Sequence, residues 1–529
     1  MKYSILLFCL FFSCSSWMPS LSTFPDAFVY ESDYGLSLVI QEAPQKMWSS
    51  ASIWIKAPEE FQDTGLGHLL EHLLIQKKRN QYREILLEGK SNSQFVVFQC
   101  HYLAKDSQKA YRALLEMLCH NQEWSEEEIQ KAFRVLQYER LHNPKASLPQ
   151  EENLAWRIRE FQKKFFQPQN AMLCVAHPEK NVQEISRIWK EISIGFSRKQ
   201  VLNKGMPFFK ALALSPVYWK PADLHWDKDF LLFSCQDRKW AGVAALFSKQ
   251  GSPALASYFH QRDFTVWQDK NQSLAYRIVS PEYFSMLDNR PPSKILKTKS
   301  INPRKKLWLK LCDTLASSHP VRPLIALAMD ADRHDLENHA KRIFAQGNAT
   351  EISFPEEYEI DSHLAYSMAG TKVSGVRSKE YFFCHAMAVF LSQQMVSYFV
   401  DTGQAYEAVA WYDSAREILC IWVAGDLDKK GRIESDLRNL LRKASQIPIN
   451  LEQWESLADR TRLYYLKSRD FQPENFPDIV LELSSLRESQ VETEKRWKKF
   501  QNADFVCSYE GFIEWKSAIL QEKNWLFLE

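Results

Sequence analysis

The most informative stretch of this sequence is Gly65–Leu66–Gly67–His68–Leu69–Leu70–Glu71–His72, which opens a predicted helix over residues 64–76. On a helix, His68 and His72 lie one turn apart, so both imidazoles project from one face, and Glu71 lies close to that face. Two such histidines can bind a zinc ion while the neighbouring carboxylate accepts the proton of a zinc-bound water. The order of the residues is the inverse of the commoner His-Glu-x-x-His motif.

The rest of the predicted helix is mostly apolar. Its apolar residues include Leu66, Leu69, Leu70, Leu73 and Leu74. Polar side chains are costly in such a helix unless they are paired. The alternative interpretation is a set of polar helix residues without a metal. A shared ligand explains two histidines and a glutamate in this position more readily, so we interpret the stretch as a metal site.

The stretch resembles the signature of the insulinase–pitrilysin family of zinc peptidases, also called the M16 or inverzincin family. The order of the neighbouring predicted elements is similar to that family as well. These elements are strands over 35–41, 50–56 and 94–103, a helix over 107–119, and a helix that begins with a capping-box pattern at Ser125. The resemblance covers about residues 28–200 and, more weakly, about residues 350–480. It implies an α+β (α/β layered) fold in which M16-like halves, each a sheet packed with helices, form a clamshell around a chamber.

The family has a third protein ligand, a glutamate on a later helix. Residues 135–140 match that helix, so the resemblance implies that Glu139 is the third zinc ligand. Glu128 and Glu151 are the fallback candidates. The interval between His72 and Glu139 is shorter than the family usually shows.

Two further positions resemble substrate-binding residues of the family. Asn92 matches an asparagine on the strand edge that holds the substrate backbone, although a turn residue is an equally good interpretation. Tyr406 matches a tyrosine of the C-terminal half that contacts substrate across the chamber. Two positions depart from the family pattern, because Phe399 replaces an arginine and Ala132 replaces a glutamate. These departures favour a less efficient peptidase.

The function that the resemblance implies is that of a zinc-dependent endopeptidase. His68, His72 and Glu139 would hold Zn²⁺ and leave one position for water, and Glu71 would act as the general base. A closed chamber would admit short or unfolded peptides, and a homodimer or a paired M16-like subunit would complete it. The alternative is a catalytically weak or inactive M16-like protein that binds peptides or serves as a partner subunit.

The length of 529 residues suggests two to four domains. We predict a signal peptide over 1–22, an N-terminal zinc-binding M16-like domain over 23–205, a middle region over 206–345 and a C-terminal M16-like domain over 346–529. The middle region is either a degenerate M16-like domain or an unrelated insert. Lys and Arg total 67 against 65 Asp and Glu, a formal net charge of +2. This balance gives no electrostatic reason to expect nucleic acid as a partner.

The N-terminus has the features of an export signal. Lys2 is followed by the apolar run 5–12 and by the small residues 13–16, as in a cleaved signal peptide. We therefore expect an exported protein, either periplasmic or secreted. Cys14 also resembles the acceptor of a bacterial lipoprotein, so a membrane-anchored lipoprotein is the second alternative. The apolar run is too short to span a membrane. We expect that no later stretch has the length and apolarity of a transmembrane helix, and therefore that the rest of the chain has no transmembrane span.

Two of the ten cysteines, Cys9 and Cys14, lie in the signal, and the others are scattered without a CxxC pair. This spacing excludes a zinc ribbon and a thioredoxin-like motif. Cys174 lies in an apolar run and is interpreted as a core residue. The sequence leaves open which cysteines pair in an oxidising compartment.

Overall fold

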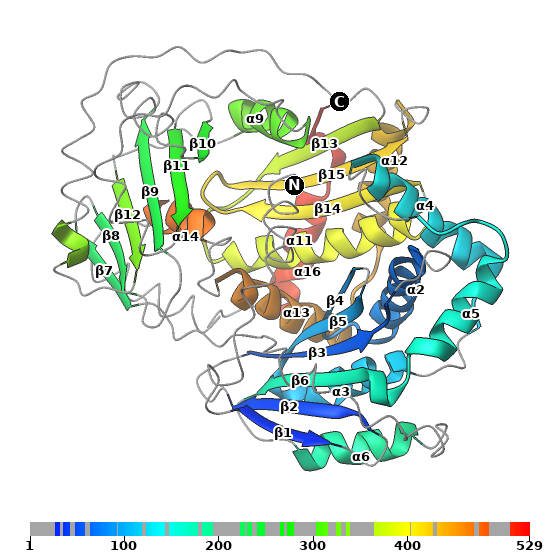
Figure 1. The fold of residues 1–529 in the computed structure, drawn as a ribbon. Coiled ribbons are helices and arrows are strands. Elements are labelled where there is room, and N and C mark those ends of the chain that lie inside the picture. Colours follow the sequence, from blue (N-terminus) through cyan, green and yellow to red (C-terminus); the bar gives the residue numbers. More distant parts are fainter. Residues whose placement is uncertain are drawn as a thin grey trace, which may run out of the picture. The chain divides into compact units, whose positions relative to one another are not determined.

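The fold is known from a computed structural model (Figure 1), which describes part of the chain. The described residues are 27–31, 35–42, 48–58, 64–92, 94–118, 123–142, 148–177, 182–193, 223–227, 230–234, 241–248, 265–268, 272–279, 303–315, 324–329, 335–338, 364–402, 404–426, 431–469, 476–485 and 508–528. They belong to two compact units. Unit 1 contains Met1–Tyr218, Phe399–Tyr406 and Glu455–Tyr464, and unit 2 contains Trp219–Tyr398, Glu407–Trp454 and Tyr465–Glu529.

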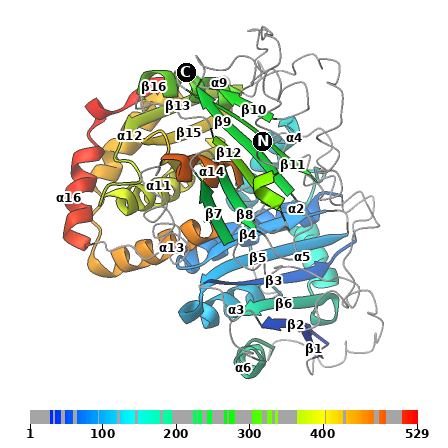
Figure 2. The same ribbon diagram turned by 90° about the vertical axis from the view of Figure 1, so that its left-hand side faces the viewer.

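Unit 1 is built on a six-stranded sheet with the strand order β1-β2-β6-β3-β5-β4, which can be followed in Figure 2. The strands are β1 (Ala27–Glu31), β2 (Ser37–Glu42), β3 (Trp48–Lys56), β4 (Leu86–Ser91), β5 (Phe95–Leu103) and β6 (Ala171–His177). Strands β2 and β6 are parallel, whereas the other neighbouring pairs are antiparallel. The sheet is therefore mixed, and β4 forms one of its edges.

The helices of unit 1 pack against a single face of this sheet. They are α2 (Leu66–Gln81), α3 (Ser107–Leu115), α4 (Glu126–His142), α5 (Leu154–Phe165) and α6 (Val182–Ile192). Alternate strand residues such as Ile53, Ile55 and Phe98 share one core cluster with buried residues of all these helices. Their neighbours Trp54 and Val97 belong to a separate cluster, as expected for side chains that alternate between the two faces of a strand. Unit 1 is therefore a layer of helices on a layer of strands.

Unit 2 contains a second six-stranded sheet with the order β10-β11-β9-β12-β8-β7. Its strands are β7 (Asp223–Asp227), β8 (Phe230–Ser234), β9 (Ala241–Ser248), β10 (Thr265–Gln268), β11 (Gln272–Val279) and β12 (Leu324–Met329). In the reverse direction this order repeats the first sheet strand for strand. The strand directions repeat as well, because β8 and β12 are the parallel pair and the other pairs are antiparallel. The described strands of the middle region therefore have the same order and directions as those of the first sheet, and the nature of this region stays a prediction.

A third sheet in unit 2 has the order β14-β15-β13-β16. Its strands are β13 (Leu364–Lys372), β14 (Ala405–Asp413), β15 (Ile418–Asp426) and β16 (Leu526–Leu528). This order matches β4-β5-β3-β6 of the first sheet, and β13 is antiparallel to both β15 and β16, as β3 is to β5 and β6. Helix α11 (Tyr381–Met395) lies between β13 and β14 in the chain, as α2 lies between β3 and β4.

Unit 2 also contains further described α-helices. They are α9 (Pro303–Leu315), α12 (Arg432–Gln446), α13 (Leu451–Arg469), α14 (Phe476–Ser485) and α16 (Tyr509–Ile519). Part of α13 is counted with unit 1. The α+β fold class expected from the sequence is confirmed. Helices and strands alternate along the chain, and the described strands form mixed or antiparallel sheets. The clamshell arrangement and the domain boundaries stay predictions.

One described helical segment, Tyr381–Val400, is long and apolar enough to cross a membrane by length and composition alone. The expectation that no later stretch has this character was wrong for this segment. More than half of its most apolar window, 56%, is buried inside the fold, as is usual for a core helix of a globular domain. The predicted signal peptide over 1–22 and Cys14 lie outside the described residues.

The described cysteines are buried in the core. They are Cys100, Cys174, Cys312, Cys384 and Cys420. Cys174 is 2% exposed, which confirms its interpretation as a core residue, and burial raises the pKa of its thiol to about 12. A thiol with so high a pKa is neutral near pH 7 and is a poor nucleophile.

Candidate metal centre

Helix α2 begins at Leu66, directly after Gly65, whose backbone lies in the left-handed region with φ of 79°. A Cβ atom at this position would lie 2.7 Å from the backbone nitrogen of Pro149, so both the conformation and the close approach require glycine. The apolar stripe of the helix is buried, with no member more than 1% exposed: Leu66, Leu69, Leu70, Leu73 and Leu74. Burial of this stripe fixes the rotation of α2 about its axis and leaves His68 and His72 on its half-buried side.

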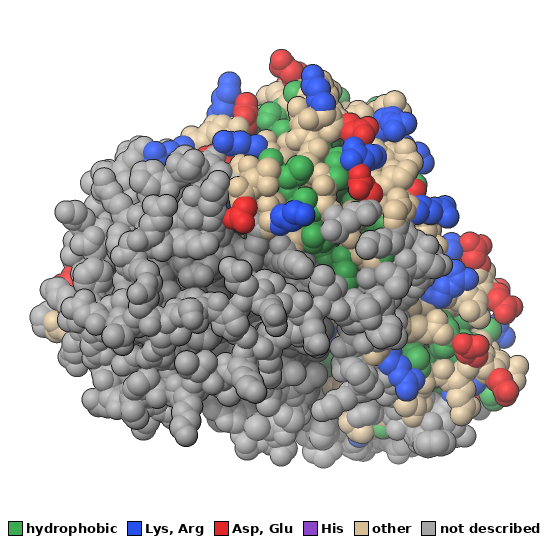
Figure 3. Space-filling view, turned by 90° about the horizontal axis from the view of Figure 1, so that it is seen from above, with side chains coloured by type: hydrophobic (Ala, Val, Ile, Leu, Met, Phe, Trp, Pro, Cys, Tyr) green, Lys and Arg blue, Asp and Glu red, His purple; other side chains and the backbone are tan. Residues whose placement is uncertain are grey.

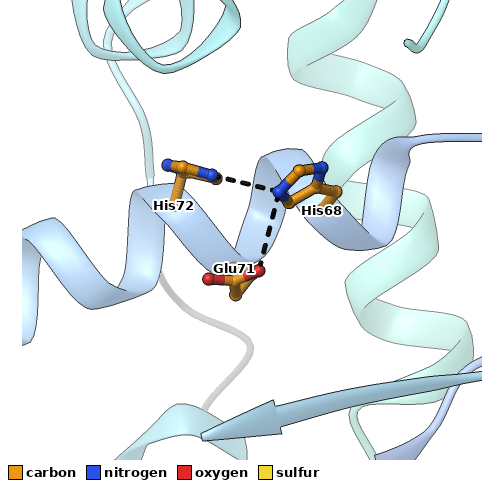
Figure 4. A group of neighbouring side chains, drawn as sticks. All are labelled: His68, Glu71 and His72. Carbon is orange, nitrogen blue, oxygen red and sulfur yellow. Dashed lines mark hydrogen bonds and ion pairs between the residues drawn. The ribbon is translucent and has the colours of Figure 1, made fainter. Parts of the chain in front are cut away.

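His68 and His72 point toward each other from successive turns of α2 (Figure 4). Their Nε2 atoms are 3.2 Å apart. The two side chains are 25% and 23% exposed, so they are accessible from solvent without being fully hydrated. Together with Glu71 they form a group in which the potential ligand atoms all lie within 4.8 Å of one another. This group is close enough to bind a metal ion.

Glu139 on helix α4 reaches both histidines. Its Oε2 atom lies 3.1 Å from Nε2 of His68, and its Oε1 atom lies 3.5 Å from Nε2 of His72. Helix α4 is held at this place because its apolar residues, among them Phe133 and Leu136, share the core cluster with α2. Bonds of about 2.0–2.1 Å in tetrahedral geometry place two ligand atoms of zinc about 3.3 Å apart. The three groups therefore fit the spacing that a tetrahedral zinc ion requires.

The charges of this site are strongly coupled. Burial lowers the pKa of His72, but the hydrogen bond with Glu139 and the charges of Glu71 and Glu139 outweigh it, so the pKa of His72 is raised above 6.5. Burial raises the pKa of Glu139, but hydrogen bonds with His68 and His72 outweigh it and hold that pKa well below its usual range. Glu139 is therefore ionised at neutral pH, which is the state of a carboxylate ligand.

Glu71 is set apart from these three groups. Its side chain is 10% exposed, and its Oε2 atom is 3.9 Å from Nε2 of His68. The carboxylate lies against strand β4, where Oε2 accepts a hydrogen bond of 3.2 Å from the hydroxyl of Ser91 and Oε1 lies next to Gly89. Neither residue stands out in the sequence, since strand β4 is not among the predicted elements. Their alternate spacing places both on one face of that strand.

The fallback candidates for the third ligand are placed differently. Glu128 accepts hydrogen bonds from the backbone N–H and the hydroxyl of Ser125, at 2.8 and 2.9 Å, so it belongs to the cap of helix α4. Glu151 is exposed before helix α5. The two departures from the family pattern are both buried apolar residues: Ala132 is 3% exposed and Phe399 is 1% exposed.

The two predicted substrate-binding residues lie in different settings. Asn92 is exposed in the turn between β4 and β5. Its Oδ1 atom accepts hydrogen bonds from the backbone N–H groups of Gln94 and Phe95, at 2.8 and 2.9 Å, so its side chain shapes this turn. Tyr406 lies in strand β14, and its side chain is outside the described part of the structure.

The described surface carries both signs of charge. In Figure 3, Lys and Arg side chains are interspersed with Asp and Glu side chains over the described part of the face shown. Exposed pairs of opposite charge include Arg112 with Glu191 and Arg187 with Glu191. This distribution follows the near balance of 67 basic and 65 acidic residues.

Comparison with known proteins gives low similarity throughout. No family model matches the chain, and no curated protein matches it. Solved structures similar to the chain include a protease from Helicobacter pylori (10% identity, 96% of this chain and 100% of that chain, TM-score 0.30) and the periplasmic protease PqqL from Escherichia coli (10% identity, 92% and 72%, TM-score 0.33). A peptidase M16 inactive domain from Pseudomonas fluorescens is also similar (7% identity, 95% and 96%, TM-score 0.28). At these values the likeness carries no functional argument.

Proposed function

We propose that this chain is an exported zinc-dependent endopeptidase that hydrolyses short or unfolded peptides. His68, His72 and Glu139 would be the zinc ligands, and Glu71 would be the general base. One observation carries the proposal: three ligand groups are spaced for a tetrahedral metal ion, while a second carboxylate, that of Glu71, lies beside them against strand β4. Export to the periplasm or secretion, with lipid attachment at Cys14 as the alternative, follows from the signal sequence.

The chemistry divides between the metal and Glu71. When bound, zinc supplies a Lewis acid that polarises the peptide carbonyl and makes water acidic near neutral pH. With His68, His72 and Glu139 as ligands, one position at the metal would remain for water. Glu71 accepts the proton of the attacking water at a carboxylate oxygen and then delivers it to the leaving amine. Its distance of 3.9 Å from His68 leaves Glu71 within reach of a water between the two groups.

The proposed peptide-binding element is the edge strand β4. An extended peptide can add to an open sheet edge by main-chain hydrogen bonds, and β4 carries the residues that contact Glu71. A peptide on this edge would therefore bring its carbonyl groups close to the general base. Asn92 stands at the end of the same strand, and we propose it and Tyr406 as substrate-binding residues. A homodimer or a paired M16-like subunit would enclose the peptide.

A second candidate function is a catalytically weak or inactive protein that binds peptides. The buried apolar positions of Ala132 and Phe399 favour it, since the family resemblance implies charged side chains there. Binding alone, however, gives no reason for Glu71 to stand beside the ligand groups. The two candidates differ in whether zinc-loaded protein cleaves peptides.

The deciding experiment measures zinc content and peptide cleavage for the wild type, Glu71→Gln and His72→Ala. We expect one zinc per chain and cleavage of an unstructured peptide library in the wild type. Glu71→Gln should keep zinc and lose cleavage by about 10³-fold, because it removes the proton acceptor and no ligand. His72→Ala should lose both.

The third ligand is tested in the same way with a matched control on helix α4. Glu139→Gln should weaken zinc binding, whereas Glu127→Gln, at a glutamate that is 77% exposed, should leave it unchanged. Equal cleavage by Glu71→Gln and wild type would contradict the assigned base. Bound zinc without cleavage by any variant would support the peptide-binding alternative, and wild type without zinc would exclude both.

A further inference from the structure

The carboxylate of Glu71 can lie either among the metal-ligand groups or beside them, and only the second position allows it to act as a base. On helix α2 it lies three residues after His68 and next to His72, so its flexible side chain can turn toward the ligand groups. A carboxylate that joined His68, His72 and Glu139 as a fourth ligand would occupy the position left for water. It could then no longer accept the proton of that water. Something must therefore hold Glu71 outside the ligand set.

Strand β4 contacts both oxygens of the Glu71 carboxylate. The hydroxyl of Ser91 donates to Oε2 over 3.2 Å. This is longer than the usual O–H···O distance, as is common for catalytic hydrogen bonds before the substrate is bound. On the other side, a Cβ atom at Gly89 would lie 2.3 Å from Oε1 and 2.6 Å from Cγ of Glu71. The carboxylate therefore occupies the space that a side chain at Gly89 would fill.

The two residues act from one face of the same strand. Gly89 and Ser91 are two positions apart, so both face α2, whereas Lys90 between them faces the other way. The strand is held in register by its pairing with β5, in which Gly89 is opposite Phe98 and Ser91 is opposite Val96. Both partners on β5 are buried, at 0% exposure. The contact surface for Glu71 is thus part of a rigid sheet.

We propose that Ser91 is a positioning residue for Glu71. It acts together with Gly89, whose lack of a side chain leaves room for the carboxylate. The hydroxyl holds the carboxylate against β4, beside the three ligand groups but outside them. This inference rests on the proposed peptidase function. It adds that the geometry of the base is set by a side chain that is neither a ligand group nor the base itself.

The test compares Ser91→Ala with Ser91→Thr, which restores a hydroxyl at the same place. Ser107→Ala is the matched control, because Ser107 also donates to a glutamate, Glu184, over 3.1 Å, but this pair lies on helices α3 and α6, which carry none of the site residues. Ser91→Ala should lower kcat about tenfold, in the range found for residues that orient a metal site, with KM nearly unchanged. Ser91→Thr should recover most of this loss, and Ser107→Ala should match the wild type.

A readout independent of cleavage is the visible spectrum of the cobalt-substituted proteins. Cobalt stoichiometry should stay at one per chain in all variants. The spectrum of Ser91→Ala should change, because Glu71 enters the coordination sphere, and adding Glu71→Gln to Ser91→Ala should abolish the change. Thermal unfolding of each variant shows that it is folded, and a loss of kcat shared equally by Ser91→Ala and Ser107→Ala would assign the effect to stability and overturn the proposal.

The outcomes separate this inference from the proposed function. A wild-type kcat and an unchanged cobalt spectrum in Ser91→Ala would overturn the positioning role while leaving the peptidase intact. A metal-loaded wild type that cleaves nothing would refute the peptidase, and the spectrum of Ser91→Ala would still decide where Glu71 is held. A wild type that binds no metal would overturn both.

Discussion

The contact between Gly89 and Glu71 gives a prediction about stability that needs no substrate. Gly89 is the perturbed residue, and Gly89→Ala adds one methyl group. The new Cβ atom would lie 2.3 Å from Oε1 of Glu71, whereas non-bonded heavy atoms settle at about 3.5–4.0 Å. The carboxylate must therefore move by more than ~1 Å. Positive φ values among the described glycines occur at Gly35, Gly65 and Gly431, so the backbone of Gly89 does not itself resist alanine.

The size of the effect follows from two opposing terms. Overpacking a buried contact costs about 1–3 kcal/mol, whereas replacing glycine by alanine at a compatible position contributes about 0.4–1 kcal/mol through the unfolded chain. Gly89→Ala should therefore lower the free energy of unfolding of unit 1 by ~1–2 kcal/mol. With Glu71→Ala already present the clash is gone, and the same change should be neutral or stabilising. The coupling between the two positions is then about 2 kcal/mol.

Thermal unfolding of the metal-free full-length protein measures this coupling in a double-mutant cycle of wild type, both single variants and the double variant. Metal is removed with a chelator because a bound ion stabilises the folded state by an amount of its own. At about 2–4 °C per kcal/mol for a domain of this size, Gly89→Ala should lower Tm by roughly 2–8 °C in the wild type and not at all in Glu71→Ala. An equal shift in both backgrounds would refute the contact between Gly89 and Glu71.

Two other predictions concern the metal and the end of helix α2. Because the pKa of His72 is raised above 6.5 and zinc binds only the neutral imidazole, zinc affinity should fall about tenfold per pH unit below that raised pKa. The fall should begin above pH 6.5; chelator-competition titrations that stay flat through this range would contradict it. Glu116→Ala should lower the free energy of unfolding by ~3 kcal/mol. The change removes the carboxylate that lies 2.5 Å from the ammonium group of Lys78, a side chain that is only 8% exposed. Glu160→Ala, which breaks the exposed pair with Lys163, should cost at most ~1 kcal/mol by the same thermal assay.

Much of unit 1 was predictable because its strong elements have strong local patterns. Strand β5 was predicted over 94–103 and observed as Phe95–Leu103. The predicted helix over 64–76 begins where expected and continues to Gln81 as α2. The capping box predicted at Ser125 is present, since the backbone N–H of Glu128 donates to Oγ of Ser125 and the backbone N–H of Ser125 donates to the Glu128 carboxylate. Hydrophobic period and cap residues act over a few positions, so a sequence displays them directly.

Strand β4 is an element that local sequence patterns do not predict. It contains Glu88, Gly89 and Lys90, residue types that are depleted in strands, and it exists because it pairs with β5. The repeated strand order in the second sheet was equally out of reach, since it depends on which distant strands become neighbours. Pairing over long chain separations leaves no periodic signal in the sequence.

Part of the candidate site could likewise be predicted from the sequence, and part depends on packing. The sequence alone determined that His68, Glu71 and His72 share one helix face, because helical spacing fixes the relation of residues three and four apart. Glu139 came from the family resemblance, and only the packing of α4 on α2 decided that its two oxygens lie 3.1 and 3.5 Å from the histidine nitrogens.

The tertiary structure also decided the different position of Glu71. Nothing in the helix distinguishes a carboxylate that joins the ligands from one that stands beside them. That distinction is made by Ser91 and Gly89 on an edge strand that the sequence did not reveal. The physical reason is that a short helical motif sets the directions of its own side chains, whereas the position of a flexible carboxylate is set by the surface that packs against it.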